Sequence, residues 1–443
     1  MNLSFFKKTD GNHIEFFQEG DDYYTRYLQM IDEAQSSIHL QTYIFKEDAF
    51  GQQVIRALIR SAERGVKVYV LIDSVGSFDF SRQAEERLKE AGIYFCRFNG
   101  IRIRWLGQWG RRLHHKVLLT DHERAIIGGI NVISESYLDS QKVPHQLDFA
   151  VYLEGPVATD LTRYCQLIFS KACKLKLKFP DPRLEPRTEF PDGVALQISI
   201  NDWIYRRWQI TRLYSQLTKV ANREIIIVNS YFFPRKKFMK QLKAAAERGV
   251  RVRLILPRFS DWPSYVKATQ YLYAYFLKNK IEVYEWKSSI LHGKLALIDG
   301  TWSTIGSFNL NYTSYQQNLE MNVNVFDPAF NQKLNQQLQK YMDEGCEKIN
   351  SSTFLEKADW MTKASRFFFY IILSLVANFS IGIAFQIEEG RGMTRKFITV
   401  GVSIIFFIIG VMGLMLPLIP GTPFLIVSLL LICRQIAKNN VQV

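Results

Sequence analysis

The alternation of apolar and polar positions repeats itself along the chain. Arg60–Ser74, "RSAERGVKVYVLIDS", returns as Ala244–Arg258, "AAAERGVRVRLILPR". In each copy a helical pattern ends at a glycine, Gly65 or Gly249, which suits a left-handed helix cap, and the alternating apolar residues that follow predict a strand. Upstream, "SSIHLQTYIF" and "REIIIVNSYFF" are also strand-like. Both copies therefore predict a strand, a helix and a second strand, within a duplicated α/β fold.

A proline-rich stretch, "KFPDPRLEPRTEFPDG", separates the two copies and has the composition of a linker. We therefore expect four parts. These are a first half over 1–175, a linker over 176–195, a second half over 196–355 and a C-terminal membrane anchor over 356–443.

The anchor is expected because two apolar runs near the C-terminus lack charges. Phe367–Phe385 has 19 residues and Phe397–Leu416 has 20. At about 1.5 Å per residue, each is roughly long enough to cross a ~30 Å hydrocarbon core as a helix. A buried helical hairpin in a soluble domain is the alternative. A third run, Phe424–Cys433, is too short to span a bilayer alone.

Composition and charge then limit the partners. Hydrophobic residues make up 47% of the 443 residues, enough for a sizeable core, and the formal net charge of +14 favours nucleic acid or an acidic lipid surface. Since the cysteines are scattered without a CxxC pair, we expect neither a disulfide framework nor a zinc site, and a reduced, cytosol-facing globular part. They are Cys96, Cys165, Cys173, Cys346 and Cys433.

Each copy carries the same polar residues at the same spacing: a histidine, then a lysine, an aspartate and an asparagine two, seven and seventeen positions further on. They are His114, Lys116, Asp121 and Asn131 in the first copy, and His292, Lys294, Asp299 and Asn309 in the second. On a strand, residues two apart point to the same face, so each histidine projects with its lysine. The intervening His115 and Gly293 face the other way.

These residue types suit phosphoryl chemistry. A neutral imidazole can attack phosphorus and hold a covalent intermediate, while a protonated imidazole opposite it gives a proton to the departing alcohol. The lysines and asparagines can bind the non-bridging oxygens, and no metal or cofactor is needed. Carboxylates that fix each imidazole tautomer are expected at Asp148 and Glu320. Asp121 and Asp299 either take part directly or only form a turn at a strand end.

Both motifs resemble the HKD signature of the phospholipase D superfamily and, within it, the bacterial cardiolipin synthases. The resemblance covers roughly residues 10–350 and includes "LQTYIFKEDAFG", "SYFFPRKKF" and "LHGKLALIDGTWSTIGSFNLNYTSYQQNLEMNV". It implies two α/β/α sandwich units that meet at a pseudo-two-fold axis, with both motifs at the seam. It also implies that His114 is the nucleophile and His292 the acid. Ser307, matched by Gly129 in the first copy, joins the expected substrate-binding residues.

The resemblance implies a phosphatidyltransferase that joins two phosphatidylglycerol molecules through a phosphohistidine and releases glycerol, at the bacterial inner membrane. Its partners would be the bilayer and anionic phospholipids, including its product cardiolipin. Hydrolysis to phosphatidic acid by a phospholipase D is the first alternative. A nuclease is permitted by the charge but opposed by the apolar runs, and a non-catalytic scaffold is opposed by two complete motifs. No oligomeric state is indicated.

The arginine-rich segment before the first motif, Arg97–Arg112, also contains Trp105 and Trp109. Arginines can hold anionic headgroups, and indoles favour the boundary between membrane and water. A solvated basic loop is the alternative for this segment.

Overall fold

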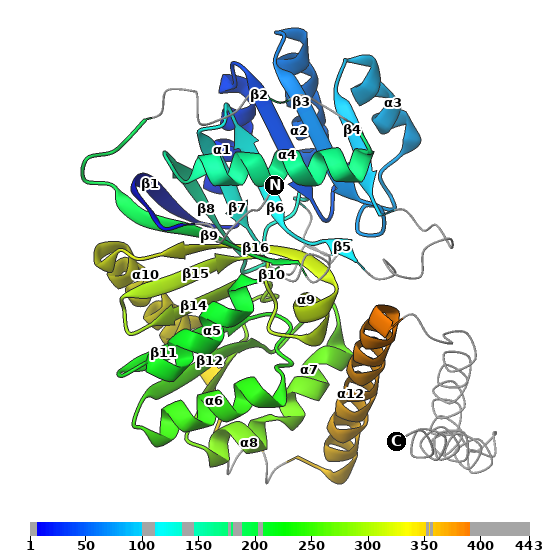
Figure 1. Cartoon of the computed structure of the whole chain (residues 1–443). Helices are drawn as coiled ribbons and strands as arrows, with labels where there is room; N and C mark the ends of the chain where they lie inside the picture. The colour runs from blue at the N-terminus through cyan, green and yellow to red at the C-terminus, as the bar shows by residue number, and fades with distance from the viewer. Residues whose placement is uncertain are drawn as a thin grey trace, which may run out of the picture. The chain divides into compact units, whose positions relative to one another are not determined.

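Two mixed β-sheets organise the protein, one from each copy of the repeat (Figure 1). The computed structural model describes residues 7–99, 111–134, 146–175, 179, 188–202, 207–350, 354 and 358–389. Side chains in the last of these ranges are described to residue 375 and at 377.

The first half contains a seven-stranded sheet in the order β1–β8–β7–β6–β2–β3–β4, and a short strand β5 outside it. Strands β2, β3 and β4 are parallel to one another, with β4 at the edge of the sheet, and the rest pair antiparallel. The strands are β1 (Thr9–Gln18), β2 (Ser37–Thr42), β3 (Lys67–Asp73), β4 (Tyr94–Phe98), β5 (Arg112–Leu113), β6 (Lys116–Thr120), β7 (Arg124–Gly128) and β8 (Phe149–Glu154). The helices are α1 (Asp21–Glu33), α2 (Ala49–Glu63), α3 (Arg82–Glu90) and α4 (Ala158–Cys173).

The second half repeats this arrangement, with the order β10–β9–β16–β15–β14–β11–β12–β13–β17. Its strands are β9 (Val194–Asp202), β10 (Arg207–Trp208), β11 (Glu224–Asn229), β12 (Arg251–Pro257), β13 (Glu282–Trp286), β14 (Lys294–Ile298), β15 (Trp302–Gly306), β16 (Asn318–Val325) and β17 (Cys346–Lys348). Its helices are α5 (Gln209–Val220), α6 (Lys236–Glu247), α7 (Pro263–Tyr271), α8 (Tyr273–Lys278), α9 (Tyr312–Gln316) and α10 (Pro328–Lys340), with a π-helical turn η3 (Tyr341–Gly345).

The repeat predicted from the sequence is confirmed in both halves. Parallel strands β2 and β3 are joined by α2, and parallel strands β11 and β12 are joined by α6. Gly65 and Gly249 follow these helices with φ of 92° and 91°, a left-handed conformation that glycine adopts without a steric cost.

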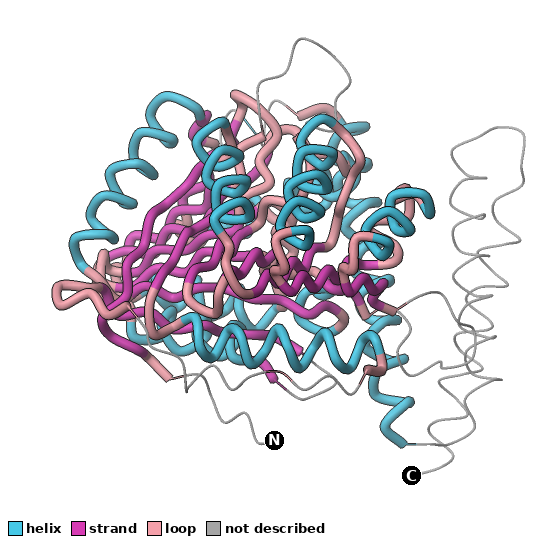
Figure 2. Tube along the Cα trace, turned by 90° about the horizontal axis from the view of Figure 1, so that it is seen from above, coloured by secondary structure: helices cyan, strands magenta, loops and turns pink. Residues whose placement is uncertain are grey.

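Helices cover both faces of each sheet, so each half is an α/β/α sandwich (Figures 1 and 2). One core cluster lies between the first sheet and α1, α2 and α3, and another between the second sheet and α5, α6 and α8. A third cluster contains residues of both sheets together with α4 and α10. This shared core holds the two halves together, because neither half can bury its inner face alone.

Backbone pairing also crosses between the halves. Strand β1 pairs with β8 of its own sheet and with β9 of the second, and β16 pairs in parallel with β5 of the first half.

The strand order places the functional segments of each half together, at one end of the strands of its sheet. Gln41 of β2 pairs with Val117 of antiparallel β6, and Asn229 of β11 pairs with Lys294 of β14. The C-terminal ends of β2 and β3 therefore lie beside His114, and the C-terminal ends of β11 and β12 lie beside His292. We call these two groups of strand ends, one in each sheet, the catalytic edges.

The chain forms two compact units, Met1–Leu373 and Ser374–Val443, and the first unit contains both halves. Helix α12 (Trp360–Glu389) includes the backbone of the first apolar run, Phe367–Phe385. Within the part of the chain that the structure describes, no helix is both long enough and apolar enough to cross a bilayer. The second run, Phe397–Leu416, lies outside the described residues, so membrane helices are not shown.

The structure contains a disulfide that the spacing of the cysteines did not predict. Cys96 of β4 and Cys173 at the end of α4 are disulfide-bonded, although 77 positions separate them in the sequence. Their spacing gave no signal because α4 reaches β4 only by packing on the inner face of the sheet. Cys165 and Cys346 are free and buried. The cysteine pattern therefore no longer argues for a reduced compartment.

Candidate active site

The two motif histidines meet carboxylates from the opposite half. Nδ1 of His114 lies 2.9 Å from Oε2 of Glu320 on β16, and Nδ1 of His292 lies 2.7 Å from Oδ2 of Asp148, just before β8. We call these pairs the crossed dyads. The backbone is crossed in the same way, since the N–H of His114 donates to the Leu319 carbonyl and the N–H of His292 to the Leu147 carbonyl.

The carboxylates of the crossed dyads are buried, and the hydrogen bond of each histidine to its carboxylate uses only one of the two ring nitrogens. The side chains of Glu320 and Asp148 are fully buried, whereas those of His114 and His292 are 12% and 15% exposed. With Nδ1 committed to a carboxylate, the Nε2 atom of each imidazole is the one available for chemistry. The sequence named both carboxylates but did not assign either of them to a histidine.

Burial and the neighbouring lysines favour the neutral form of both imidazoles. Burial, helped by the charges of Lys116 and Lys294 and opposed by Glu320, lowers the pKa of His114 to about 4. The pKa of His292 is also lowered, by burial and then by Lys294, against the opposing effect of Asp148. A neutral Nε2 is a nucleophile, and a bound anionic phosphate would favour protonation again.

The two motif lysines are buried behind the histidines. Nζ of Lys116 donates to the His114 carbonyl at 2.6 Å, and Nζ of Lys294 donates to the His292 carbonyl. Burial, followed by the charge of Lys294, lowers the pKa of Lys116 to about 7. Burial also lowers the pKa of Lys294, opposed by Asp148 and Glu320. Because the charge of Lys294 acts on Lys116, an anion bound near both lysines would be stabilised by both charges.

The two dyads are supported differently. The hydroxyl of Ser307 donates to Oε2 of Glu320 at 2.5 Å, and the amide of Asn318 donates to Oε1 at 3.0 Å. Burial alone would raise the pKa of Glu320, but His114, Lys116 and Ser307 outweigh it and hold that pKa below its usual range. Ser307 is fully buried, and its hydroxyl orients the Glu320 carboxylate. The sequence had led us to expect that this hydroxyl contacts the substrate.

The first half has glycine where the second has Ser307, for a steric reason. A Cβ atom at Gly129 would lie 2.2 Å from Oδ1 of Asp148, so a serine cannot stand there without moving the carboxylate. Oδ1 of Asp148 accepts the backbone N–H of Phe149 at 2.8 Å instead. Despite burial, Lys294 and His292 hold the pKa of Asp148 below its usual range.

The motif asparagines brace the segments that follow β2 and β11. Oδ1 of Asn131 accepts the backbone N–H of Ile44 at 3.1 Å, and Oδ1 of Asn309 accepts the Ser230 hydroxyl at 2.9 Å. Both side chains are buried at the catalytic edges. Their amide oxygens are used for this bracing, which leaves the amide nitrogens as the groups for a phosphate oxygen.

Asp121 and Asp299 lie away from the histidines, at the far ends of β6 and β14. The Asp121 carboxylate accepts backbone N–H groups of residues 35–37, and that of Asp299 accepts those of residues 222–224. Both residues have φ of 54°, as in tight turns. The geometry therefore favours the structural alternative over a direct chemical role, because a five-residue strand separates each aspartate from its catalytic edge.

Sequence reasoning missed two tyrosines of the site. Tyr43 follows β2 and its ring centre lies 5.0 Å from that of His114, while Tyr231 follows β11 and lies 6.1 Å from His292. The repeat did carry the signal, because "TYIF" and "SYFF" occupy matching positions after matching strands. The expected orientation of His115 is confirmed, since it is buried and bonded to the Gln41 side chain at 2.9 Å. Trp105 and Trp109 lie outside the described residues.

A third carboxyl group near the His292 dyad was also missed. Glu19 follows β1 and is buried, its backbone N–H donates to the Asp148 carbonyl at 2.9 Å, and Oε1 accepts the Tyr24 hydroxyl at 2.8 Å. Burial and the charge of Asp148 raise the pKa of Glu19 to about 8. Glu19 is therefore mainly neutral at pH 7.

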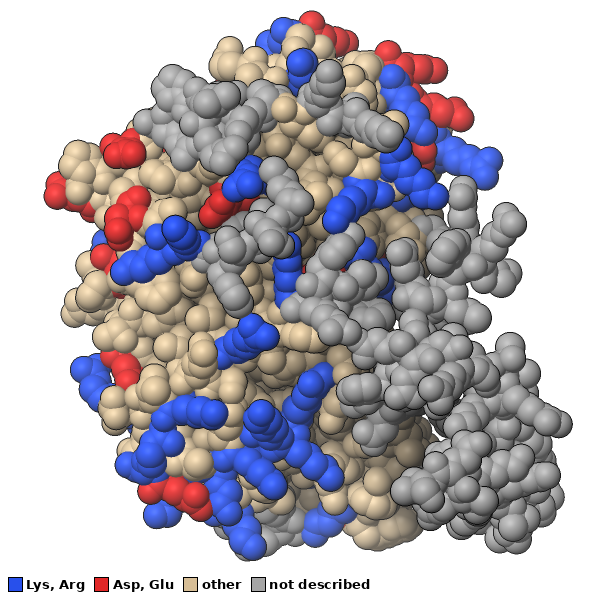
Figure 3. Space-filling view, viewed as in Figure 1, with Lys and Arg blue, Asp and Glu red and all other residues tan. Residues whose placement is uncertain are grey.

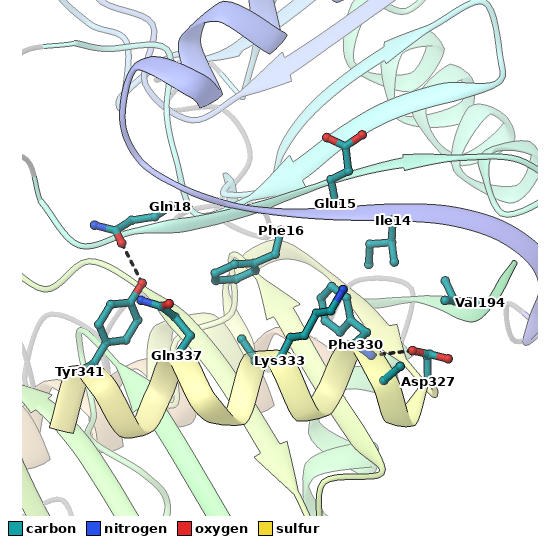
Figure 4. Close-up of a pocket in the computed structure, with 12 residues that line it drawn as sticks. Ile14, Glu15, Phe16, Gln18, Val194, Asp327, Phe330, Lys333, Gln337 and Tyr341 are labelled. Carbon is teal, nitrogen blue, oxygen red and sulfur yellow. Dashed lines mark hydrogen bonds between the residues drawn. The ribbon is translucent and has the colours of Figure 1, made fainter. Parts of the chain in front are cut away.

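A hollow of about 610 Å³ lies between β1 and α10 and is separate from the dyads (Figure 4). Apolar side chains such as Phe16 and Phe330 line it, together with Lys333. The Tyr341 hydroxyl donates to the Gln18 side chain at 2.8 Å beside this hollow. None of the motif residues lines it, so the dyads and not this hollow define the candidate active site.

Comparisons with known proteins show the family to which the chain belongs. The family model described as "Cardiolipin synthase, PLD-like domain" matches residues 27–164 and 214–342, which include both dyads. The chain is 35% identical over 368 residues to cardiolipin synthase B of Escherichia coli (strain K12), covering 82% of this chain and 88% of that protein. It is 27% identical over 338 residues to cardiolipin synthase 1 of Staphylococcus epidermidis (strain ATCC 35984), covering 76% of this chain and 69% of that protein.

A solved structure shows the same fold. Phosphatidylserine synthase of Haemophilus influenzae superimposes with a TM-score of 0.66 at 14% identity, over 85% of this chain and 97% of that one. At this identity the match concerns the fold alone. The family match covers both halves, and the curated relatives extend over most of the chain. The chain therefore belongs to the cardiolipin synthase family of phospholipase D-like enzymes.

Proposed function

We propose that this phosphatidyltransferase makes cardiolipin by transferring a phosphatidyl group from one phosphatidylglycerol to another, with release of glycerol. The observation that carries the proposal is the pair of crossed dyads. Each half contributes one histidine and the carboxylate that orients the other histidine, so both imidazoles are held where residues of the two halves meet. A two-step exchange needs one group to hold the phosphatidyl and another to move the proton.

In the first step, Nε2 of His114 attacks the phosphorus of the donor lipid. A P–N bond forms, the P–O bond to the glycerol headgroup breaks, and Nε2–H of protonated His292 gives its proton to the departing glycerol oxygen. Lys116 and Lys294 balance the charge on the non-bridging oxygens. Glu320 keeps the proton of His114 on Nδ1, which leaves the lone pair on Nε2.

In the second step, a headgroup hydroxyl of the acceptor phosphatidylglycerol loses its proton to Nε2 of His292 and attacks phosphorus. The P–N bond breaks, His114 returns to its neutral form, and His292 is protonated for the next cycle. The balance is two phosphatidylglycerols to one cardiolipin and one glycerol. Assignment of the nucleophile to His114 follows the resemblance, and its lowered pKa suits that role.

Hydrolysis by the same groups is the alternative, with water as acceptor and phosphatidic acid as product. The 35% identity to a cardiolipin synthase over most of the chain favours transfer. The expected partners are anionic phospholipids in the bacterial inner membrane, with the apolar runs after residue 366 as anchor. The net charge of +14 fits an anionic lipid surface.

Product analysis tests the proposal. Purified full-length protein is incubated with phosphatidylglycerol vesicles in the presence of a chelator, and lipids and free glycerol are quantified over time. Cardiolipin and glycerol in equal amounts support transfer. Phosphatidic acid as the main product assigns hydrolysis, and no phospholipid turnover in a protein whose melting is cooperative rejects both. His114→Ala is the inactive control.

A further inference from the structure

Four large apolar side chains are exposed on the loops that follow β3 and β12. In the first half these are Val75 and Phe78, which are 38% and 74% exposed. In the second half they are Phe259 and Trp262, which are 54% and 58% exposed. We call these four residues the loop tips. They occur at the same place in both halves, so the exposure is a property of the repeated unit.

Both loops leave the catalytic edges and contact the site tyrosines. In the first half, the Ser77 hydroxyl donates to the Tyr43 carbonyl at 2.9 Å, and Tyr43 packs against His114. In the second, the Tyr231 hydroxyl donates to Asp261 at 2.5 Å, and Tyr231 packs against His292. The loop tips are one or two residues away from Ser77 and Asp261 in the sequence. They therefore flank the two catalytic histidines.

Positive charge accompanies the loop tips in the second half. Lys236 and Lys237 are exposed in the first turn of α6, which begins where the segment after β11 leaves the catalytic edge. Figure 3 shows that lysine and arginine side chains gather over the part of the face where α5 and α6 lie in Figure 1. Exposed aromatic residues at the same end of the sheet as basic ones suit the interface of an anionic membrane.

Helix α7 connects this surface to the start of the apolar C-terminal run. Trp262 directly precedes α7, and Tyr271 at the other end of α7 packs against Phe367 and Tyr370 of α12, with ring centres 5.5 and 4.5 Å apart. Phe367 is the first residue of that run and is 49% exposed. Exposed apolar side chains thus lie at both ends of α7, at the catalytic edge and beside α12.

We propose that the loop tips insert into the leaflet of an anionic bilayer and seat the active site against it, independently of the C-terminal anchor. The inference rests on the proposed function only in taking phospholipid as the substrate. Insertion on both sides of the site would bring a headgroup phosphate to His114 while its acyl chains stay in the leaflet. Removal of whole lipids from the bilayer would then be unnecessary.

The test compares one variant in which all four loop tips are serine with the unchanged full-length protein. Turnover of phosphatidylglycerol is measured on vesicles and on a short-chain form that stays monomeric in solution, counting cardiolipin and phosphatidic acid together. The expected result is a fall of at least tenfold in the ratio of vesicle turnover to monomer turnover. An unchanged ratio overturns the proposal.

A matched control removes exposed apolar side chains at the opposite edges of the sheets. Tyr94 is the first residue of β4 and Val220 ends α5 just before β11, and they are 44% and 64% exposed. In the variant Tyr94→Ser/Val220→Ser the ratio should stay within about twofold of the unchanged protein. If this ratio fell as far as in the loop-tip variant, loss of any exposed apolar side chain would have the same effect, and the proposal would also be overturned.

A second measurement stays informative if no lipid is turned over and the proposed function fails. A polarity-sensitive dye is attached to Trp262→Cys or to Val220→Cys, and the unchanged protein treated with the same dye gives the background from native cysteines. On addition of phosphatidylglycerol vesicles, the dye at 262 should shift to shorter emission wavelength and the dye at 220 should not. No shift at 262 contradicts insertion whatever the enzyme makes.

Discussion

Glu320 of the second half holds the imidazole of His114 of the first half, with 2.9 Å between Oε2 and Nδ1. Asp148 holds His292 in the reverse direction at 2.7 Å. Neither half therefore contains a complete histidine–carboxylate pair. Activity requires both halves in register, and the shared core and the pairing of β5 with β16 supply that register.

The crossed dyads predict the effect of neutralising each carboxylate. Glu320→Gln and Asp148→Asn should each lower kcat about 10²-fold or more, because the imidazole loses the group that fixes its tautomer and stabilises its charged form. The free energy of unfolding should change much less than the rate. Full kcat in either variant would contradict an orienting role for that carboxylate.

The two histidines should fail in different ways. His114→Ala should abolish the covalent phosphatidyl-enzyme, whereas His292→Asn should still form it slowly with a donor whose leaving group is a phenol, since that donor needs little protonation. A rapid quench in denaturant at alkaline pH, where a P–N bond is stable, followed by mass spectrometry of the protein locates the label. Labelled protein in His114→Ala together with none in His292→Asn would reverse the assignment.

Asp121 and Asp299 should matter for stability and little for catalysis. Each accepts three backbone N–H groups, so Asp299→Ala or Asp121→Ala should lower the free energy of unfolding by about 1–3 kcal/mol. The rate per folded molecule should stay within a few-fold of the unchanged enzyme. Urea melts and active-site titration separate the two quantities, and a loss of kcat comparable to that of Glu320→Gln would show a chemical role.

The lowered pKa of Lys116 predicts proton uptake when an anion binds. At pH 8 the group, with a pKa of about 7, is mostly neutral, and a bound phosphodiester raises that pKa and draws in a proton. At pH 6 the lysine is already charged and takes up none. Affinity of His114→Ala for a soluble glycerophosphodiester should therefore weaken as pH rises above 7.

Calorimetry in two buffers of different ionisation enthalpy measures this uptake directly. Adding Lys116→Arg to His114→Ala supplies a side chain that stays charged across this range, so the uptake at pH 8 should decrease by the share that Lys116 contributed. Equal uptake with lysine and with arginine would place the titrating proton on another group.

Glu19 should make the protein less stable as pH rises. Its pKa in the folded protein, about 8, lies above the ordinary value of 4.5, so the unfolded chain loses the proton first and unfolding is favoured between these two values. Glu19→Gln removes this effect. Its gain in unfolding free energy should grow from pH 5 to pH 8, reach roughly 1–4 kcal/mol, and then level off.

Urea melts at several pH values measure that gain. Glu63→Gln changes an exposed glutamate of α2 and should show no comparable trend. A gain for Glu19→Gln that does not depend on pH would mean that the carboxyl of Glu19 does not titrate in this way.

Local pattern was enough to predict the repeated unit and its motif. Gly65 and Gly249 end helices, and alternating apolar residues form β3 and β12, because backbone conformation and burial on one face follow from nearby residues. Equal spacing in two copies also identified His114 and His292, since a duplicated site must keep its offsets. Tyr43 and Tyr231 were predictable in the same way and were missed.

The sequence by itself therefore determined two α/β halves, the paired histidines and lysines, and the two candidate carboxylates, while the family resemblance implied the sandwich arrangement. Only the tertiary structure decided which carboxylate serves which histidine, that Asp121 and Asp299 lie at the far ends of their strands, and that Cys96 meets Cys173. Those contacts depend on how the two sheets share one core. A one-dimensional pattern records which face of an element is apolar, but not which other apolar face will cover it.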